Sequence, residues 1–191
     1  MQTKNQNNTP GFTLTELIVV IALLTILVSA IAQIFLSNSR LYETQSGEIL
    51  SISATRAAAD MIADFGRSAV ALVDSYTYSG QTYNLGPSAV IFKIPSIDAS
   101  KNIINGSYDY GIVGAYPANS NRLVAVMAPA AGSSRLARLL EITDHLTAVN
   151  FSYDNADSTK IKYVTYDLTV TETGRSPGSE HIYGSVNLRN H

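Results

Sequence analysis

The chain changes its hydrophobic pattern twice. Residues 1–11 are polar, and an apolar run then extends over residues 17–36. No Asp, Glu, Lys or Arg occurs from Leu17 through Ser39, a stretch of 23 residues. As a helix these residues rise roughly 35 Å, which is enough to cross a hydrocarbon core of about 30 Å. The pattern therefore predicts a membrane-spanning helix near the N-terminus.

A helical period continues beyond the apolar run, from Arg40 to about Val73. Pro is absent there, and apolar residues recur at i, i+3, i+4, i+7, i+11 and i+14. They are Ala58, Met61, Ile62, Phe65, Ala69 and Leu72. The charged residues fall on a different face, which is predicted to be solvated, and they are Arg56, Asp60, Asp64 and Arg67. We expect one helix with a membrane half, 12–39, and an amphipathic half, 40–73.

The remainder, 74–191, has the composition of strands and turns, with ten of the eleven Tyr, nine of the twelve Gly and five of the six Pro. Alternating residues predict a hairpin of 146–153 and 161–170 around a polar turn at 154–158, and a last strand that carries Ile182, Val186 and Leu188. Further candidate strands are Ala89–Ile94, Tyr108–Val113, Arg122–Met127 and Arg135–Glu141. Short connections favour antiparallel pairing. The predicted fold class is α+β, with the long helix packed on an antiparallel β-sheet head.

Composition excludes several classes of function. The chain carries 13 Lys and Arg against 15 Asp and Glu, a net charge of -2, so no nucleic-acid partner is predicted. Charged residues make up 15%, against about 25% in a typical domain, and the apolar run accounts for the shortage. The absence of Cys excludes disulfides, thiolate metal sites and a Cys nucleophile.

No catalytic pattern occurs in the sequence: it contains no G-x-S-x-G, no P-loop and no H-E-x-x-H. His145 and His181 are predicted to be surface or strand residues rather than ligands or bases. Asp154 and Asp157 could offer oxygens to Ca²⁺, but the alternating ligands and distal Glu of an EF-hand are missing, so a polar hairpin turn explains them better. The sequence predicts no catalytic residue, metal, cofactor or small-molecule ligand, and an enzyme is the least favoured hypothesis.

The start of the apolar helix contains a carboxylate. Pro10 and Gly11 end any helix from the leader, and Thr13 and Glu16 have the spacing of a capping box. A carboxylate buried in lipid or between helices costs several kcal/mol unless it is paired. A cut between Gly11 and Phe12 would supply a new α-amino group as its partner.

The segment 11–17, Gly-Phe-Thr-Leu-Thr-Glu-Leu, followed by an apolar helix, resembles the class III signal of type IV pilins and type II secretion pseudopilins. The resemblance implies that a prepilin peptidase removes residues 1–11 by cutting after Gly11 and methylates Phe12. It also implies that Glu16 supports assembly by pairing with the N-terminus of a neighbouring subunit. Gln33 stands where major pilins often carry Pro, which favours a minor subunit.

The head segments also resemble one subgroup of that family. The strand at 135–141, the sequences LTAVNFSYDN, YVTYDLTV and VNLRN, and the helix ending RAAADMIADFGRSA are similar to J-type minor pseudopilins and W-type minor pilins. The resemblance implies a hetero-oligomeric filament with other pilin or pseudopilin subunits, in a tip or initiating complex. The protein is then expected in the bacterial inner membrane as a single-pass protein with its head outside the cytoplasm, and later in the pilus or pseudopilus.

Besides the disfavoured enzyme, one other hypothesis competes with this one. Ala30-Ile31-Ala32 resembles the cleavage site of an ordinary secretory signal, which would place the mature N-terminus at Gln33. The protein would then be a secreted or singly anchored β-rich binding protein. An ordinary signal has basic residues beside its apolar region, whereas here Glu16 lies beside it and the basic residue, Lys4, is distant. The lone Lys4 weakly favours a cytoplasmic N-terminus.

Overall fold

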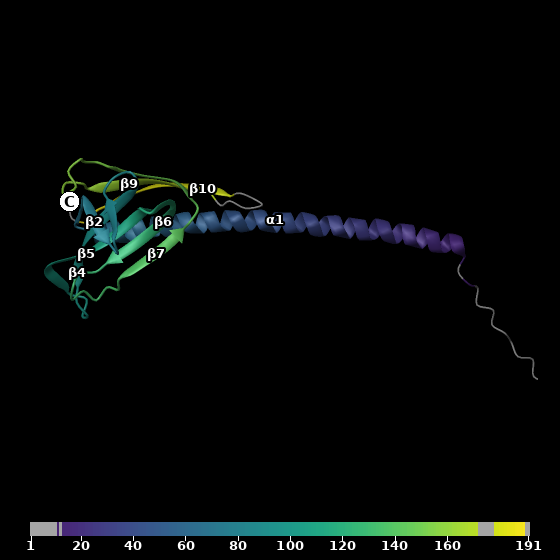
Figure 1. Ribbon diagram of the computed structural model, residues 1–191, viewed down its shortest axis with the longest axis horizontal. Coiled ribbons are helices and arrows are strands. Elements are labelled where there is room, and N and C mark those ends of the chain that lie inside the picture. Colours follow the sequence, from purple (N-terminus) through teal and green to yellow (C-terminus); the bar gives the residue numbers. More distant parts are fainter. Residues whose placement is uncertain (1–10, 12, 172–177, 190–191) are drawn as a thin grey trace, which may run out of the picture. The chain divides into compact units, whose positions relative to one another are not determined.

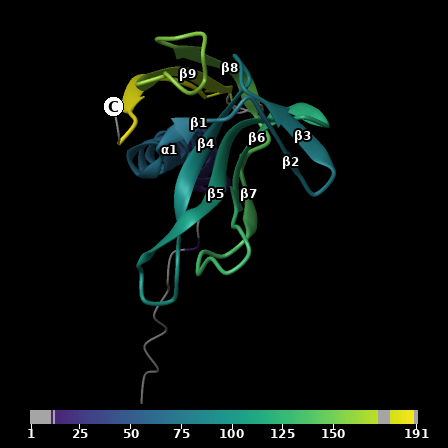
Figure 2. The same ribbon diagram turned by 90° about the vertical axis from the view of Figure 1, so that its left-hand side faces the viewer.

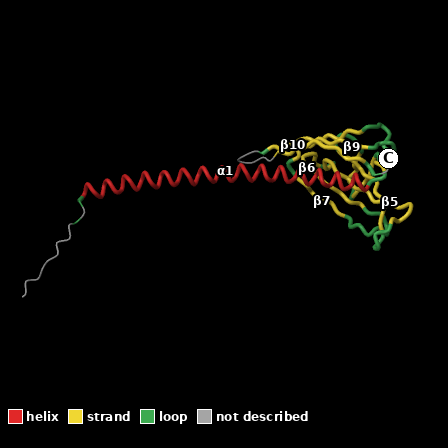
Figure 3. Tube along the Cα trace, turned by 180° about the vertical axis from the view of Figure 1, so that it is seen from behind, coloured by secondary structure: helices red, strands yellow, loops and turns green. Residues whose placement is uncertain are grey.

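The computed structural model describes residues 11, 13–171 and 178–189, and within them it contains one helix and ten strands (Figures 1 and 3). The elements are α1 (Leu14–Ser68), β1 (Ala71–Leu72), β2 (Ser75–Tyr78), β3 (Gln81–Asn84), β4 (Ala89–Ile97), β5 (Ile103–Tyr116), β6 (Asn119–Ala128), β7 (Arg138–Thr143), β8 (Leu146–Tyr153), β9 (Tyr163–Thr171) and β10 (Ser179–Asn187). The chain divides into two compact units, Met1–Glu43 and Thr44–His191, and α1 runs from the first into the second. The predicted α+β class is confirmed.

In the first unit, α1 is apolar on all sides, and its side chains from Leu14 to Tyr42 are exposed. Among the described residues, α1 is the one helix long and apolar enough to cross a membrane, judged by length and composition. Two hydroxyls interrupt the apolar surface. Thr25 Oγ1 donates to the Ile21 carbonyl at 2.5 Å, and Ser29 Oγ donates to the Thr25 carbonyl at 2.7 Å. These groups are satisfied within the helix, as a lipid environment requires.

The second unit contains three antiparallel sheets, visible in Figure 2. The largest has five strands in the order β1-β4-β5-β6-β7, the next has three in the order β10-β9-β8, and β2 pairs with β3. Side chains from α1, from one face of the five-stranded sheet and from one face of the three-stranded sheet meet in a single core. The opposite face of the five-stranded sheet packs against the β2–β3 hairpin in a second, smaller cluster around Tyr83.

The helix contributes its predicted apolar stripe to the main core. Ala58 and Ile62 are completely buried, Phe65 is almost so, and the Phe65 ring meets the edge of Phe92 on β4, with the ring centroids 6.2 Å apart. Ala69 and Leu72 are buried just beyond the helix end. The four charged residues predicted on the other face are all exposed, as expected; they are Arg56, Asp60, Asp64 and Arg67.

Two glycines allow α1 to approach both sheets closely. A Cβ on Gly66 would lie 2.5 Å from Val186 Cγ2 on β10, closer than real Cβ atoms come. A Cβ on Gly111, in β5, would lie 2.8 Å from the Phe65 ring. Gly66 therefore does not merely weaken the helix, as its low helix propensity suggests. It leaves the space into which the three-stranded sheet packs.

The helix ends at Ser68 rather than near Val73 as expected. Its last turn is closed by the Ala69 N–H, which donates to the Gly66 carbonyl at 3.2 Å, and the Val70 N–H then donates to the Lys93 carbonyl at 2.9 Å. The next two residues pair with β4 as the short strand β1. Tertiary pairing thus replaces a helical turn that local sequence alone favours.

β4, β5 and β6 are longer than expected, and the strands differ from expectation in three further places. The β2–β3 hairpin was not predicted, and its turn residues Ser79 and Gly80 both have positive φ, at 48° and 78°. β7 begins at Arg138 rather than Arg135, because the preceding loop is held elsewhere by its own hydrogen bonds. β9 begins at Tyr163 rather than Ile161, because Asp154 Oδ1 accepts the backbone N–H groups of Lys162 and Tyr163 at 2.9 and 3.3 Å.

A buried carboxylate organises that loop before β7. Asp109 on β5 is fully buried, and it accepts bonds from the Ser96 hydroxyl and Ala130 N–H on Oδ1 and from the Ser133 hydroxyl and Arg135 Nη1 on Oδ2, at 2.5–2.8 Å. Burial alone raises the pKa of Asp109, but these hydrogen bonds outweigh it and hold the pKa below its usual value. The carboxylate is therefore ionised at neutral pH, and it contributes stability that is lost only as the pH falls below the ordinary range of a carboxyl group.

The close approach at Gly66 generates a prediction. We expect Gly66→Ala to lower the free energy of unfolding, because overpacking costs about 1–3 kcal/mol and outweighs the gain of about 1 kcal/mol in helix propensity. The cost should shrink by at least about 1 kcal/mol when Val186 is already Ala. Urea unfolding of the full chain in neutral detergent, for the two single variants and the double variant, measures this coupling. An equal cost in both backgrounds would show that the contact is not limiting.

Candidate processing and assembly site

The helix begins at a complete capping box. The Leu17 N–H donates to the Thr13 carbonyl at 3.2 Å, which makes Thr13 the N-cap residue of α1. The Glu16 N–H donates to Thr13 Oγ1 at 3.3 Å, and the Thr13 N–H donates to Glu16 Oε2 at 3.4 Å. The Thr13 hydroxyl also donates to Glu16 Oε2 at 3.3 Å. The predicted capping box is thus confirmed by bonds in both directions.

These bonds place the Glu16 carboxylate at the very start of the helix. It lies in the first turn, where the helix dipole favours a negative charge, and it points back along the chain to the N–H of Thr13. Thr13 directly follows Phe12, the residue that would carry a new α-amino group after cleavage. Phe12 itself lies outside the described residues.

Gly11 lies in an exposed, non-helical position before the cap. A Cβ placed on it would meet no heavy atom within 4 Å. Within the described part of the chain, the side-chain position of Gly11 is therefore open. The leader residues 1–10, including Lys4 and Pro10, lie outside the described residues.

The acidic turn between β8 and β9 uses its carboxylates for its own folding. Asp157 accepts the N–H and hydroxyl of Thr159 at 3.1 and 2.7 Å and lies 3.0 Å from Lys160 Nζ. The Thr159 hydroxyl and Lys160 lower the pKa of Asp157 to about 2. The Asp157 N–H in turn donates to the Asn155 side-chain oxygen at 2.9 Å. The contacts are those of a polar turn, and no cluster of three metal-ligating side chains occurs in the described ranges.

The two histidines expected outside any site lie in the head. His181 on β10 is exposed, and its Nε2 lies 2.7 Å from Asp167 Oδ1 on the paired strand β9. His145 is half-buried between β7 and β8, with Nε2 at 3.3 Å from Asp144. Each imidazole lies beside a carboxylate, and neither histidine neighbours the helix start in sequence.

The arrangement at the helix start coincides with a known motif. Residues 6–32 match the family model of the prokaryotic N-terminal methylation motif. The match supports a type IV pilin-like substrate of prepilin peptidase, and it includes Gly11, Phe12, Glu16 and the apolar run as far as Ala32. Such proteins are structural subunits, and an apolar N-terminal helix of this kind indicates membrane anchoring before entry into a filament. Comparisons with curated proteins and with solved structures find no match.

The capping box can be tested without any assembly assay. Thr13→Ala removes the acceptor for the Glu16 N–H, and loss of an N-cap costs about 1 kcal/mol. We expect the Glu16 amide proton to exchange about fivefold faster, measured by hydrogen exchange of the full chain in neutral detergent. Thr25→Ala is the control, because its hydroxyl bonds a carbonyl deeper in the helix and should leave the first turn unchanged. Equal exchange in Thr13→Ala and the parent would contradict the cap.

Proposed function

We propose that the protein is a minor pilin or pseudopilin, a structural subunit of a type IV pilus or type II secretion filament. The observation that carries the proposal is the combination of the methylation motif over residues 6–32 with a carboxylate held at the first turn of an uncharged helix. The precursor inserts as a single-pass protein in the bacterial inner membrane, with the head outside the cytoplasm. Prepilin peptidase then cuts after Gly11 and methylates the amino group of Phe12.

Glu16 is the proposed assembly carboxylate. In the single chain its oxygen accepts the neutral N–H and hydroxyl of Thr13. An ammonium group on the N-terminus of a neighbouring subunit makes a charge-assisted bond, which is roughly twice as strong as a neutral one. As the helix leaves lipid for the filament interior, Glu16 exchanges Thr13 for this ammonium group. The new ion pair matters there because an unpaired buried charge would be costly.

Features of the head favour a subunit of the filament tip or of an initiating complex. Its segments carry the resemblance to J-type minor pseudopilins and W-type minor pilins, and α1 packs on antiparallel sheets as that architecture requires. The partners are then other pilin or pseudopilin subunits, contacted through the apolar half of α1 and through the head.

The first test concerns processing. We expect Gly11→Ala to accumulate as uncleaved precursor, and N-terminal sequencing of the parent to begin at Phe12. Since a Cβ at residue 11 meets no heavy atom within 4 Å in the described part of the chain, the defect would lie in recognition by the peptidase rather than in folding. Gly86→Ala is the matched control, because its Cβ also meets no atom within 4 Å and it should be processed normally. A mature N-terminus at Gln33 would instead support the ordinary secretory signal.

The second test separates charge from capping. Glu16→Gln keeps a side chain that can close the capping box, whereas Glu16→Ala keeps neither cap nor charge. We expect both to insert in the membrane and both to enter filaments at least about tenfold less than the parent, the equivalent of about 1.4 kcal/mol. Thr13→Ala, which keeps the carboxylate, should assemble far better than either. Normal incorporation of Glu16→Gln, counted by immunoblot of sheared filaments, would rule out the pairing mechanism.

A further inference from the structure

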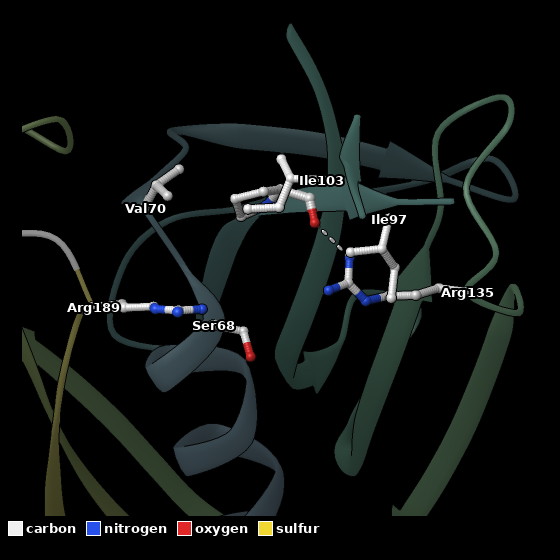
Figure 4. Close-up of a pocket in the computed structure, with 7 residues that line it drawn as sticks. Ser68, Val70, Ile97, Ile103, Arg135 and Arg189 are labelled. Carbon is white, nitrogen blue, oxygen red and sulfur yellow. Dashed lines mark hydrogen bonds between the residues drawn. The ribbon is translucent and has the colours of Figure 1, made fainter. Parts of the chain in front are cut away.

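A cavity of about 320 Å³ lies in the head beside the end of α1 (Figure 4). Most of its wall is apolar and comes from the chain after the helix and from β4 and β5: Val70, Pro95, Ile97 and Ile103. Ser68 at the helix end and two arginines, Arg135 and Arg189, complete it, and the two guanidinium groups point toward one another in Figure 4. Its volume is at the lower end of the range for small-molecule sites. The sequence predicted no such site.

Arg135 is held rigidly at one side of the cavity. Its Nη1 donates to Asp109 Oδ2 at 2.5 Å and to the Pro95 carbonyl at 2.7 Å, and its side chain is 23% exposed. Since both bonds use Nη1, the N–H groups of Nε and Nη2 have no acceptor within the described part of the chain. Asp109 neutralises the charge of Arg135 and fixes its orientation, while leaving donors that can bind a ligand.

Arg189 supplies an uncompensated charge. Its backbone N–H donates to the Ala69 carbonyl at 3.2 Å, which anchors the residue next to the end of α1. Its guanidinium makes no ion pair or hydrogen bond with the residues that the structure describes, and no acidic residue lines the cavity. A cation near a helix C-terminus is favourable for the helix dipole, so a purely structural role is the alternative. A role at the helix end alone does not explain why the guanidinium faces an apolar cavity.

The charges and walls together define a ligand class. One guanidinium is balanced by Asp109, and the other has no acidic partner among the described residues, so the site favours a ligand with a single negative charge. Guanidinium groups bind carboxylates through parallel N–H bonds, and the apolar wall accommodates a short aliphatic group. We propose that this cavity binds a monocarboxylate that carries an apolar group about the size of one amino-acid side chain. The proposal is independent of the proposed filament function.

Such a ligand has two sources, a free aliphatic acid or the C-terminal residue of a peptide. Titration calorimetry on the full chain in neutral detergent, with hexanoate and with acetyl-leucine as probes, distinguishes them. We expect at least one acid to bind with a dissociation constant of about 1 mM or lower. Hexanamide and acetyl-leucine amide should bind at least about tenfold more weakly, because they lack the charge. Tighter binding of acetyl-leucine indicates a peptide terminus, and tighter binding of hexanoate a free acid.

Two variants test the site itself. Arg189→Gln and Ile103→Asp should each weaken acid binding at least about tenfold. Ile103 is 60% exposed, so the added carboxylate repels the ligand without disturbing the core. Arg67→Gln is the matched control, because Arg67 is exposed in the last turn of α1 but does not line the cavity. Unchanged thermal unfolding of Arg189→Gln shows that the loss is not one of folding.

Three results would overturn the proposal. Acids and amides that bind equally would show that the arginines do not select charge. Parent-like affinity in Arg189→Gln would assign that arginine to the helix end alone. Absence of acid binding at about 10 mM, in a chain whose unfolding shows it to be folded, would leave the cavity without the proposed ligand.

Discussion

The packing of the second half of α1 against both sheets is the contact on which the head depends. One apolar face of the five-stranded sheet and one of the three-stranded sheet share a core with α1, which contributes Ala58, Ile62 and Phe65 to it. Burying a side chain the size of Ile62 stabilises the fold by about 1.5–3 kcal/mol. Gly66 and Gly111 set how close the layers come. The head is therefore built around a helix whose other half is made for a different environment.

One helix thus serves two solvents through a change in side-chain pattern along its length. In the first unit its apolar residues are exposed on all sides, and the hydroxyls of Thr25 and Ser29 bond its own carbonyls. In the second unit the apolar residues narrow to a stripe, and charged residues occupy the remaining face. The exposed apolar surface of the first half can pack against lipid tails or against other apolar helices, because the two are similarly apolar. The proposed passage from membrane to filament requires such a surface.

Features that depend on neighbours in sequence could be predicted, and features that depend on topology could not. The apolar stripe, the Thr13–Glu16 capping box and most longer strands follow from local spacing. The helix end could not be predicted, because β1 exists only through its pairing with β4. The β2–β3 hairpin does have a local signal, the Ser79-Gly80 pair between two segments that contain Tyr. Arg135 and Arg189 stand far apart in sequence and line the same cavity only in the folded head.

The main role of the buried Asp109 is to position the loop before β7 and the side chain of Arg135, rather than to add stability. A buried ion pair often contributes less than a well-packed apolar substitute, because desolvation offsets the attraction. Asp109 nevertheless receives four donors, from β4 and from the loop before β7, so its oxygens are satisfied and that loop has one arrangement. An apolar residue at 109 would pack, but it would release the loop and leave Arg135 without its carboxylate. The network fixes the direction in which Arg135 presents the N–H groups that Asp109 and Pro95 do not use. The buried Asp109 thus determines how Arg135 lines the cavity that it shares with Arg189.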